Sequence, residues 1–301
     1  MDRVGASPPC RTIDPGRRAA RPGGSRIADL DVRGFNAYER HAWESVVDAY
    51  VDGFGPLTQQ TIGPILDALD VGPGTRMLDV SCGPGWLSEA ASDRGAMTIG
   101  VDVSTSMLRT ATARRSAARL IAGDAHNLPL ASGTIDALGC LYGLLHLGDP
   151  DAALREAWRV LRPGGRIACS VWAEPNQAVA FQIVLKALAE FGQGEAAIPP
   201  GPPFFRFSDP DEARRSLETA GFVDPTFRLV PQAWRLSSPE QLFLIMRDGT
   251  ARTRGQIIAQ TDAAQRAIQD AVTAAAARFR RPSGAIELPM PACVFAASKP
   301  D

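Results

Sequence analysis

The sequence predicts an α/β fold that is doubly wound around a mostly parallel sheet, and two observations indicate it. Between residues 76 and 172, short apolar runs alternate with stretches of helical periodicity, and such alternation is typical of strands joined by crossover helices. The first apolar run also ends in an acidic residue and a glycine-rich turn, within Leu78-Asp-Val-Ser-Cys-Gly-Pro-Gly85. In this kind of fold a ligand binds at the carboxyl ends of the strands.

The individual elements follow from the spacing of apolar residues. We expect strands at 76–80, 97–101, 119–122, 135–141 and 166–172, separated by helices at 86–94, 105–117 and 151–161. Two earlier helices, at 36–51 and 58–69, carry apolar and aromatic residues at helical spacing. After residue 172 we expect helices at 178–191 and 210–220, the second capped by Ser208, and mostly helix over 239–281. Strands are expected at 222–236 and 286–298.

Two further acidic positions follow apolar runs. Thr98-Ile-Gly-Val-Asp102 comes about twenty residues after the glycine-rich turn, the spacing at which a carboxylate meets a ribose with both hydroxyls free. Gly123-Asp124-Ala125 follows the next run. Glycines allow close backbone approach to a ligand, and the next helix directs its positive N-terminus at it. The pattern therefore predicts a pocket for a nucleoside-containing ligand.

Together these motifs resemble those of the class I S-adenosylmethionine-dependent methyltransferases, especially the small-molecule branch that includes the ubiquinone and menaquinone biosynthesis methyltransferases (type 11 methyltransferase domain). The likeness runs from about Phe35 to about Trp172. It extends to Ile135-Asp136 and His146-Leu-Gly-Asp-Pro-Asp151 around the fourth strand, and to Val160-Leu-Arg-Pro-Gly-Gly-Arg166 before the fifth. Five motifs in order at the right spacing carry it.

The resemblance implies a Rossmann-like methyltransferase fold with a seven-stranded, mostly parallel sheet whose last two strands form an antiparallel pair. It implies one methyltransferase domain over 27–301, in which N-terminal helices at 27–70 cover the cofactor and 238–281 is a helical lid insertion. The sequence departs from the family pattern at Ser81, where glycine is usual. A serine there indicates a backbone angle that other residues tolerate or some stored strain.

The resemblance also assigns contacts to S-adenosylmethionine, which becomes S-adenosylhomocysteine. Asp79 is expected to meet the cofactor's ammonium, or alternatively to order its own loop, and Asp102 to accept from both ribose hydroxyls. Asp124 is expected to accept from the adenine amino group, with the Ala125 amide near the ring. The other expected cofactor residues are Ser81, Gly83, Gly85, Val103, Met107 and Leu141.

Methyl transfer is an in-line displacement, so the protein mainly supplies positioning and a dry pocket. His146 is the candidate general base, because its unperturbed pKa suits a hydroxyl or amine nucleophile; the alternative is a histidine that bonds its own loop. Tyr142 is the second catalytic candidate, or a wall residue. Candidate substrate-binding residues are the aromatic side chains Tyr38, Trp43, Phe204 and Phe205, each of which could instead serve packing alone.

Composition limits the other function classes. A net charge of −1 gives no general attraction to nucleic acid or anionic membranes. Three histidines without clustered ligands predict no metal site. Five scattered cysteines without a C-x-x-C pair fit a reducing, cytoplasmic protein. No apolar run approaches bilayer length, and the arginine- and proline-containing stretch at 1–26 reads as a disordered tail. Either a monomer or a homodimer is compatible.

The sequence thus favours a methyltransferase that acts on a small, largely apolar molecule. A nicotinamide-dependent oxidoreductase shares the glycine turn and the acid after the second strand, but Ser88 stands where the full G-x-G-x-x-G pattern needs glycine. A non-catalytic S-adenosylmethionine-binding protein is the other alternative, with Ser81 as the sign of decay. A nucleic-acid methyltransferase is disfavoured by the charge balance and the missing Asn-Pro-Pro-Tyr motif.

Overall fold

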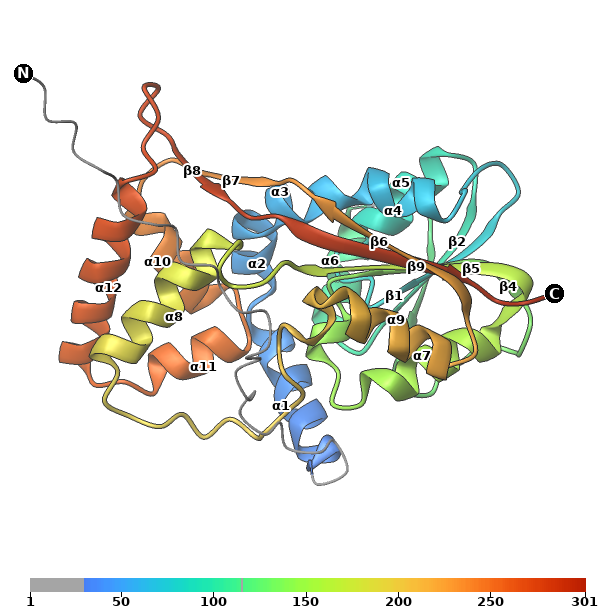
Figure 1. The fold of residues 1–301 in the computed structure, drawn as a ribbon, viewed down its shortest axis with the longest axis horizontal. Coiled ribbons are helices and arrows are strands. Elements are labelled where there is room, and N and C mark those ends of the chain that lie inside the picture. The colour runs from blue at the N-terminus through green and yellow to red at the C-terminus, as the bar shows by residue number, and fades with distance from the viewer. Residues whose placement is uncertain (1–29, 115) are drawn as a thin grey trace, which may run out of the picture.

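The computed structural model describes residues 30–114 and 116–301, so the tail expected at 1–26 lies outside the described residues. Its centre is a seven-stranded sheet in the order β3-β2-β1-β4-β5-β9-β6 (Figure 1). The strands are β1 (Arg76–Val80), β2 (Met97–Asp102), β3 (Arg119–Ala122), β4 (Ile135–Leu141), β5 (Leu161–Trp172), β6 (Val223–Val230) and β9 (Ala292–Ser298). The first five are parallel, and β9 runs antiparallel to both β5 and β6. The predicted fold class is confirmed.

Helices cover both faces of this sheet. Figure 1 shows α4 (Ile62–Ala68) and α5 (Trp86–Asp93) on one face, and α7 (Pro150–Val160) and α9 (Pro210–Thr219) on the other. α6 (Thr105–Ala113) packs against β2 and β3. The central strands are therefore buried on both sides, as Leu78 and Leu138 are, and this explains why they read as continuous apolar runs.

The N-terminal helices are α1 (Val32–Ser45), α2 (Val47–Gly53), α3 (Gly55–Thr58) and the 3₁₀ turn η2 (Gln59–Thr61). Three polar side chains of α1 fix it to the sheet's loops. Asn36 Oδ1 accepts from the Gly148 amide at 2.8 Å, and Glu44 accepts from the Thr105 and Ser106 amides at 2.6 and 3.0 Å. Glu39 makes the third contact, described below. α1 therefore spans from the exit of β4 to the start of α6.

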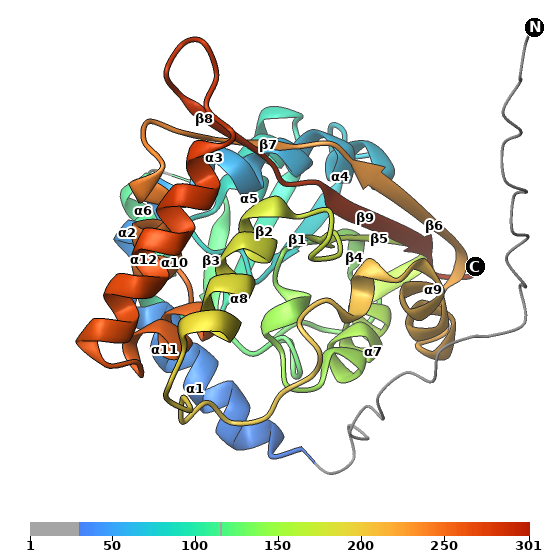
Figure 2. The ribbon, with the colours of Figure 1, turned by 60° about the vertical axis from the view of Figure 1, so that its left-hand side comes forward.

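A second group of helices lies beyond the carboxyl ends of the parallel strands. It comprises α8 (Val179–Phe191), α10 (Glu240–Asp248), α11 (Arg252–Ile258) and α12 (Asp262–Ala277). β9 leads to the C-terminus and runs antiparallel to β5, so the carboxyl end of β5 points the other way, toward these helices (Figure 1). In Figure 2, where that side comes forward, α8 and α12 stand in front of the strands. Their apolar faces, including Phe243 and Ile268, join the main core cluster.

The two long strands expected at 222–236 and 286–298 are each broken, which corrects the prediction. β7 (Ala233–Leu236) and β8 (Ile286–Pro289) pair with each other in a separate two-stranded sheet. Pro231 and Pro291 stand at the breaks, where a residue without an amide hydrogen cannot extend a ladder.

The expected cap of α9 is also wrong by one residue. Asp209 is the N-cap and accepts from the Asp211 amide, whereas Ser208 ends the 3₁₀ turn η4 (Arg206–Ser208) and donates to Phe205 O at 2.6 Å. Within residues 30–114 and 116–301, none of the helices has the length and apolar character needed to cross a membrane.

Candidate active site

A cavity opens at the carboxyl edge of the sheet, where sequence motifs and helical cover meet. Its wall comes from α1, the turn after β1, the ends of β2 and β4, residues 123–126, and the segment 249–253 before and within α11. The 3₁₀ turn η3 (Leu144–His146) contributes its last residue. The cavity therefore lies at the edge where this topology binds ligands.

Asp102 closes one end of the cavity at the last position of β2. Its Oδ2 accepts from the Gly83 amide and its Oδ1 from the Ser104 amide, both at 2.8 Å. A carboxylate oxygen has two lone pairs, so each keeps one for a ligand hydroxyl. Burial raises the pKa of Asp102 to about 6, against the opposing effect of these two amides. Ionised Asp102 thus suits a pair of ribose hydroxyls.

The glycine-rich turn leaves space beside Asp102. Gly83 has φ 51°, and a Cβ built there would meet nothing closer than the Met107 sulfur at 4.0 Å. Ser81 adopts φ 56°, the left-handed conformation that the sequence departure implied, and its side chain packs against Gly143. The turn thus keeps the glycine-type backbone despite the serine, at the cost of some local strain.

Asp79 lies behind the cavity wall rather than in it. Its Oδ2 accepts from the Ser88 amide at 3.0 Å and from the Ser88 hydroxyl at 2.7 Å, which fixes α5 to the end of β1. Its buried Oδ1 has no hydrogen-bond partner within the described residues. Burial raises the pKa of Asp79 to about 7. Asp79 therefore orders the loop between β1 and α5.

Asp124 and His126 form the outer end of the cavity. Asp124 Oδ1 accepts from the His126 amide at 2.9 Å and lies 2.6 Å from its Nδ1. The hydrogen bond from the His126 side chain is the main reason why the pKa of Asp124 is lowered. His126 Nε2 in turn accepts from the Asp149 amide at 3.3 Å. This end is polar and partly open to solvent.

Away from Asp102 and Asp124, the cavity is enclosed by aromatic rings. The cavity is lined by a closed chain of aromatic contacts, with neighbouring ring centroids 4.8–6.2 Å apart, which we call the aromatic belt. In order around the chain its members are Trp43, Tyr50, Phe54, Trp172, Phe181, Phe204 and His146. Such spacing is that of favourable edge-to-face and offset ring pairs. The belt members come from α1, α2, the residue after α2, η3, β5, α8 and the loop before η4, so the shape of the belt depends on the complete fold.

Tyr142 lies against the belt but does not offer its hydroxyl to the cavity. The hydroxyl donates to Gln232 Oε1 at 2.9 Å, and the ring stacks on Trp172 at 4.2 Å. Burial raises the pKa of Tyr142 far above its usual value. Its φ of 57° directs the ring to this position. Tyr142 therefore acts as a wall residue in this geometry.

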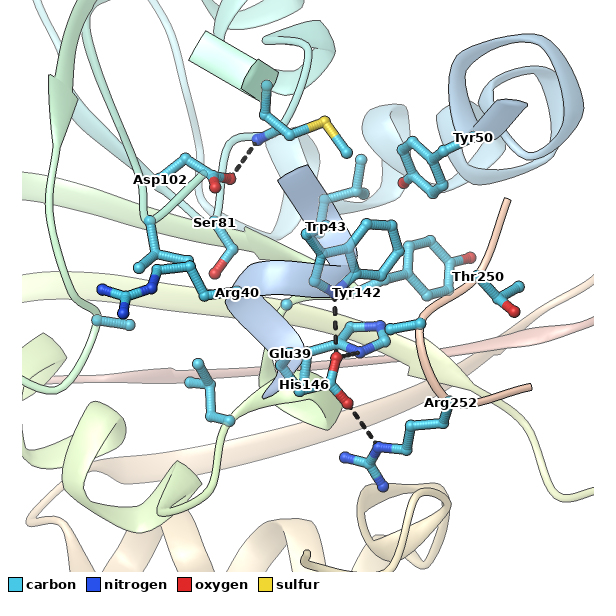
Figure 3. A pocket seen from close by; sticks show the side chains of 18 of the residues that line it. Glu39, Arg40, Trp43, Tyr50, Ser81, Asp102, Tyr142, His146, Thr250 and Arg252 are labelled. Carbon is cyan, nitrogen blue, oxygen red and sulfur yellow. Dashed lines mark hydrogen bonds and ion pairs between the residues drawn. The ribbon is translucent and has the colours of Figure 1, made fainter. Parts of the chain in front are cut away.

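His146 is held by a buried carboxylate. Its Nδ1 lies 3.0 Å from Glu39 Oε2, which also accepts from Trp43 Nε1 at 3.1 Å (Figure 3). Glu39 Oε1 accepts from Arg252 Nε at 2.7 Å. Burial favours the neutral acid, but His146 and Arg252 together outweigh it and lower the pKa of Glu39. The cavity therefore holds an ionised Glu39 between two cationic or donating partners.

Most of the predicted site residues meet at this cavity. Its wall includes Trp43, Ser81, Gly83, Asp102, Val103, Met107, Asp124, Ala125, Leu141, Tyr142, His146 and Phe204. Four others lie outside the wall as described: Tyr38, Asp79, Gly85 and Phe205. Tyr38 instead donates to Ala251 O at 3.2 Å, and Phe205 packs edge-on against Phe204.

Sequence reasoning missed Glu39, Arg252 and four members of the belt: Tyr50, Phe54, Trp172 and Phe181. For Glu39 the sequence did carry a signal. The buried face of α1 consists of Phe35, Glu39 and Ala42, so a carboxylate occupies the apolar stripe of an amphipathic helix. A charge in that position indicates a buried partner.

Comparisons with known proteins agree with this geometry. A family model described as "Methyltransferase domain" matches residues 78–169. A demethylmenaquinone methyltransferase of Paenarthrobacter aurescens is 32% identical over 173 residues, which cover 54% of this chain and 68% of that protein. One from Renibacterium salmoninarum is 30% identical over 173 residues, covering 54% of this chain and 73% of that protein.

Solved structures agree on the fold. The complex of Haemonchus contortus phosphoethanolamine N-methyltransferase 2 with S-adenosylhomocysteine superposes with a TM-score of 0.52 at 19% identity, over 89% of this chain and 60% of that one. Such identity concerns the fold alone. The sequence relatives carry the assignment, and they do not favour the oxidoreductase alternative. The chain belongs to the class I S-adenosylmethionine-dependent methyltransferases.

Proposed function

We propose that this enzyme transfers a methyl group to a small, largely apolar acceptor that carries an aromatic ring, bound within the aromatic belt. The belt is the observation that carries the proposal, because six aromatic side chains and His146 line one cavity in a closed chain of contacts. A flat ring gains offset-stacking and edge contacts there, in addition to burial of its apolar area.

The charges around the belt favour a neutral acceptor over a charged one. In the described part of the chain the carboxylates that line the cavity are Glu39, Asp102 and Asp124, and the cations are Arg40 and Arg252. Glu39 and Arg252 neutralise each other at 2.7 Å. Arg40 acts on Asp124 at the polar end of the cavity, where it helps to lower the pKa of that carboxyl. A cationic or anionic acceptor would therefore meet no unpaired counter-charge at the belt, and its desolvation would be uncompensated. The two relatives are demethylmenaquinone methyltransferases by name, which also supports an acceptor with an apolar ring.

We assign the polar end of the cavity to the cofactor. Asp102 would hold the ribose hydroxyls, Gly83 would give room for close backbone approach, and Met107 and Ala125 would pack on the adenine. Bound S-adenosylmethionine supplies an electrophilic methyl group on a sulfonium. Asp124 would accept from the adenine amino group. We assign Asp79 to ordering the loop, because its Oδ2 holds Ser88 and the residue lies behind the cavity wall.

We further propose that residues 27–301 form one methyltransferase domain. In it the N-terminal helices at 27–70 and the helical insertion at 238–281 together cover the cavity, and the insertion acts as a lid. The segment 249–253 lines the cavity, and Tyr38 and Arg252 join it to α1 and to the exit of β4. Enclosure by this segment excludes water from the reacting groups. Since Phe243, Ile268 and Val272 are fully buried, deleting the helices would expose part of the core, so point variants are the better test.

Affinity for S-adenosylhomocysteine should fall as the pH is lowered through the pKa of Asp102. With that pKa at about 6, Asp102 is mostly protonated at pH 5 and loses acceptor capacity, so affinity should drop by up to about tenfold between pH 7.5 and 5. Isothermal calorimetry across this range measures the effect. Asp102→Asn, which does not titrate, should flatten the profile; a profile equally steep in both proteins would rule out Asp102 as the titrating group.

The raised pKa of Asp102 also predicts how folding stability changes with pH. The folded chain binds this proton more tightly than the unfolded chain, whose Asp pKa is 3.8, so the contribution of Asp102 to stability decreases as pH rises from about 4 to 6. Cofactor binding and folding stability should therefore move in opposite directions with pH at this residue, and thermal melts with and without ligand separate the two.

An acceptor panel tests the proposed function. Purified enzyme and methyl-labelled S-adenosylmethionine are incubated with a reduced naphthoquinol of the demethylmenaquinone type with a short side chain, with a simple phenol, or with an aliphatic amine of similar size. Transfer to the ring compounds, weakened in Phe181→Ala relative to wild type, is expected. Transfer to the amine alone would overturn the proposal.

A further inference from the structure

We propose that Glu39 is a positioning residue for the reaction: it holds the His146 imidazole in the Nδ1–H form, so that Nε2 is the proton acceptor for a hydroxyl of the acceptor. This inference rests on the proposed function and extends it to acceptors that have a proton to lose. Glu39 and His146 come from α1 and from the exit of β4, so the pair exists only in the folded chain.

Hydrogen-bond chemistry fixes the direction of the Glu39–His146 contact. Glu39 Oε2 lies 3.0 Å from His146 Nδ1, and an ionised carboxylate can only accept. The proton of the neutral ring must therefore sit on Nδ1, and the tautomer of a histidine is set by such a partner. His146 lines the cavity and belongs to the aromatic belt, between Trp43 at 4.8 Å and Phe204 at 5.9 Å. Nε2 then offers its lone pair at the belt.

Arg252 keeps Glu39 ionised and cannot take over its role. The guanidinium uses Nε for Glu39 Oε1 at 2.7 Å, Nη2 for Leu145 O at 2.6 Å and Nη1 for Pro202 O at 3.2 Å. It also lies over the rings of Phe35 and Phe204, with centroid distances of 4.5 and 5.4 Å. Because Arg252 belongs to the segment 249–253 that lines the cavity, the carboxylate is held in place by the proposed lid.

The proton balance of the step is simple. The hydroxyl proton of the acceptor passes to Nε2 of His146, giving an imidazolium whose Nδ1–H faces the Glu39 carboxylate. The electron pair left on the acceptor, on its oxygen or delocalised to a ring carbon, forms the new bond to the methyl carbon. The carbon–sulfur bond breaks and its electrons neutralise the sulfonium. For oxygen methylation His146 then releases its proton to water; for carbon methylation the ring proton leaves to water and His146 returns its proton to the acceptor oxygen. Glu39 takes no proton and stabilises the imidazolium, as a carboxylate does in other carboxylate–histidine pairs.

Glu39→Gln gives a test that does not depend on turnover. The glutamine amide has only one accepting oxygen, whereas Glu39 uses two. Arg252 donates to one of them, and His146 and Trp43 donate to the other. The cation should take the oxygen, which turns the amide NH₂ toward His146 Nδ1 and forces that nitrogen to accept. The ring proton then moves to Nε2, and the acceptor lone pair at the belt is lost.

Nitrogen-15 NMR of histidine-labelled protein without cofactor reads the tautomer directly, at about pH 9 where neutral imidazole dominates. Wild type should show a protonated Nδ1 and an unprotonated Nε2 at His146, assigned with a His146→Gln variant, and Glu39→Gln should show the reverse. Trp43→Phe is the matched control: it removes a donor from the same oxygen without altering the charge of Glu39, so the wild-type tautomer should persist. A wild-type ring protonated at Nε2, or an unchanged tautomer in Glu39→Gln, would overturn the inference.

Kinetics gives the second reading. If Nε2 is the base, Glu39→Gln should lower kcat by about 10²–10⁴-fold with a hydroxyl acceptor and leave KM within a few-fold, since the acceptor still stacks in the belt. Affinity for S-adenosylhomocysteine should stay near the wild-type value. Equal kcat with the reversed tautomer would also overturn the inference. Failure of wild type to methylate any ring compound would instead refute the proposed function, while the tautomer result would stand on its own.

Discussion

Arg252→Ala should lower the free energy of unfolding by about 3–5 kcal/mol, the cost of leaving one partner of a buried ion pair unpaired. The side chains of Arg252 and Glu39 are 17% and 4% exposed, so solvent screens the pair little. The variant also loses two hydrogen bonds to carbonyl oxygens, those of Leu145 and Pro202. Methyl transfer should fall by more than cofactor affinity, because Arg252 lies at the belt rather than beside Asp102.

Urea denaturation at pH 7.5 measures the loss, and Arg254→Ala is the matched control. Arg254 lies in the same helix, but its side chain is 35% exposed and contacts Asp248 at 3.4 Å, so its removal should cost no more than about 1 kcal/mol. The lowered pKa of Glu39 means that the stabilising effect of ionised Glu39 is present above its usual value of 4.5 and fades as pH falls below it. The difference in free energy of unfolding between Arg252→Ala and Arg254→Ala should therefore become smaller below about pH 4.5. Equal losses of free energy of unfolding in the two variants at neutral pH would show that the Arg252–Glu39 ion pair does not stabilise the fold.

The parts of the fold that could be predicted are those specified by local patterns. Apolar runs bounded by turn residues located the five parallel strands to within a few residues, because strands buried on both faces need no partner information to be recognised. The proposed cofactor end follows the same local pattern: Asp102 is the last residue of β2, and Gly83 and Asp124 lie within three residues of the ends of β1 and β3. Where a proline interrupted an apolar run, as Pro231 and Pro291 do, the run was extended too far.

The acceptor end could not be predicted from local patterns, because its contacts join distant segments. Glu39 and Arg252 are 213 residues apart, and Tyr142 and Gln232 are 90 apart. Glu39 stands out locally, as a carboxylate on the buried face of α1, but nothing near it in the sequence identifies its partners. The belt likewise joins distant segments. Trp43, His146 and Phe204 were predicted as site residues one by one, but Tyr50, Phe54, Trp172 and Phe181 join them in one surface only after folding.

Asp102→Ala should weaken binding of S-adenosylhomocysteine by about 1.5–3 kcal/mol, or roughly 10- to 150-fold, the range for hydrogen bonds to a charged group. Asp102→Asn should cost less, since one accepting oxygen remains. Asp136→Ala is the matched control: this aspartate lies near the start of β4, pairs with Arg76 and Arg162, and should alter stability without altering affinity. Calorimetry that gives wild-type affinity for Asp102→Ala would refute the whole pocket assignment.

The alanine variant also removes the acceptor for the Gly83 and Ser104 amides, so part of its loss could come from the glycine-rich turn rather than from the ribose. A ligand-side change separates the two contributions. In wild type, the 2′,3′-dideoxy analogue of S-adenosylhomocysteine should bind more weakly than S-adenosylhomocysteine itself. In Asp102→Ala the two ligands should bind with about equal affinity, because the variant has no carboxylate to accept from the ribose hydroxyls. If the analogue loses the same affinity in both proteins, Asp102 orders the turn and the ribose is held by other groups.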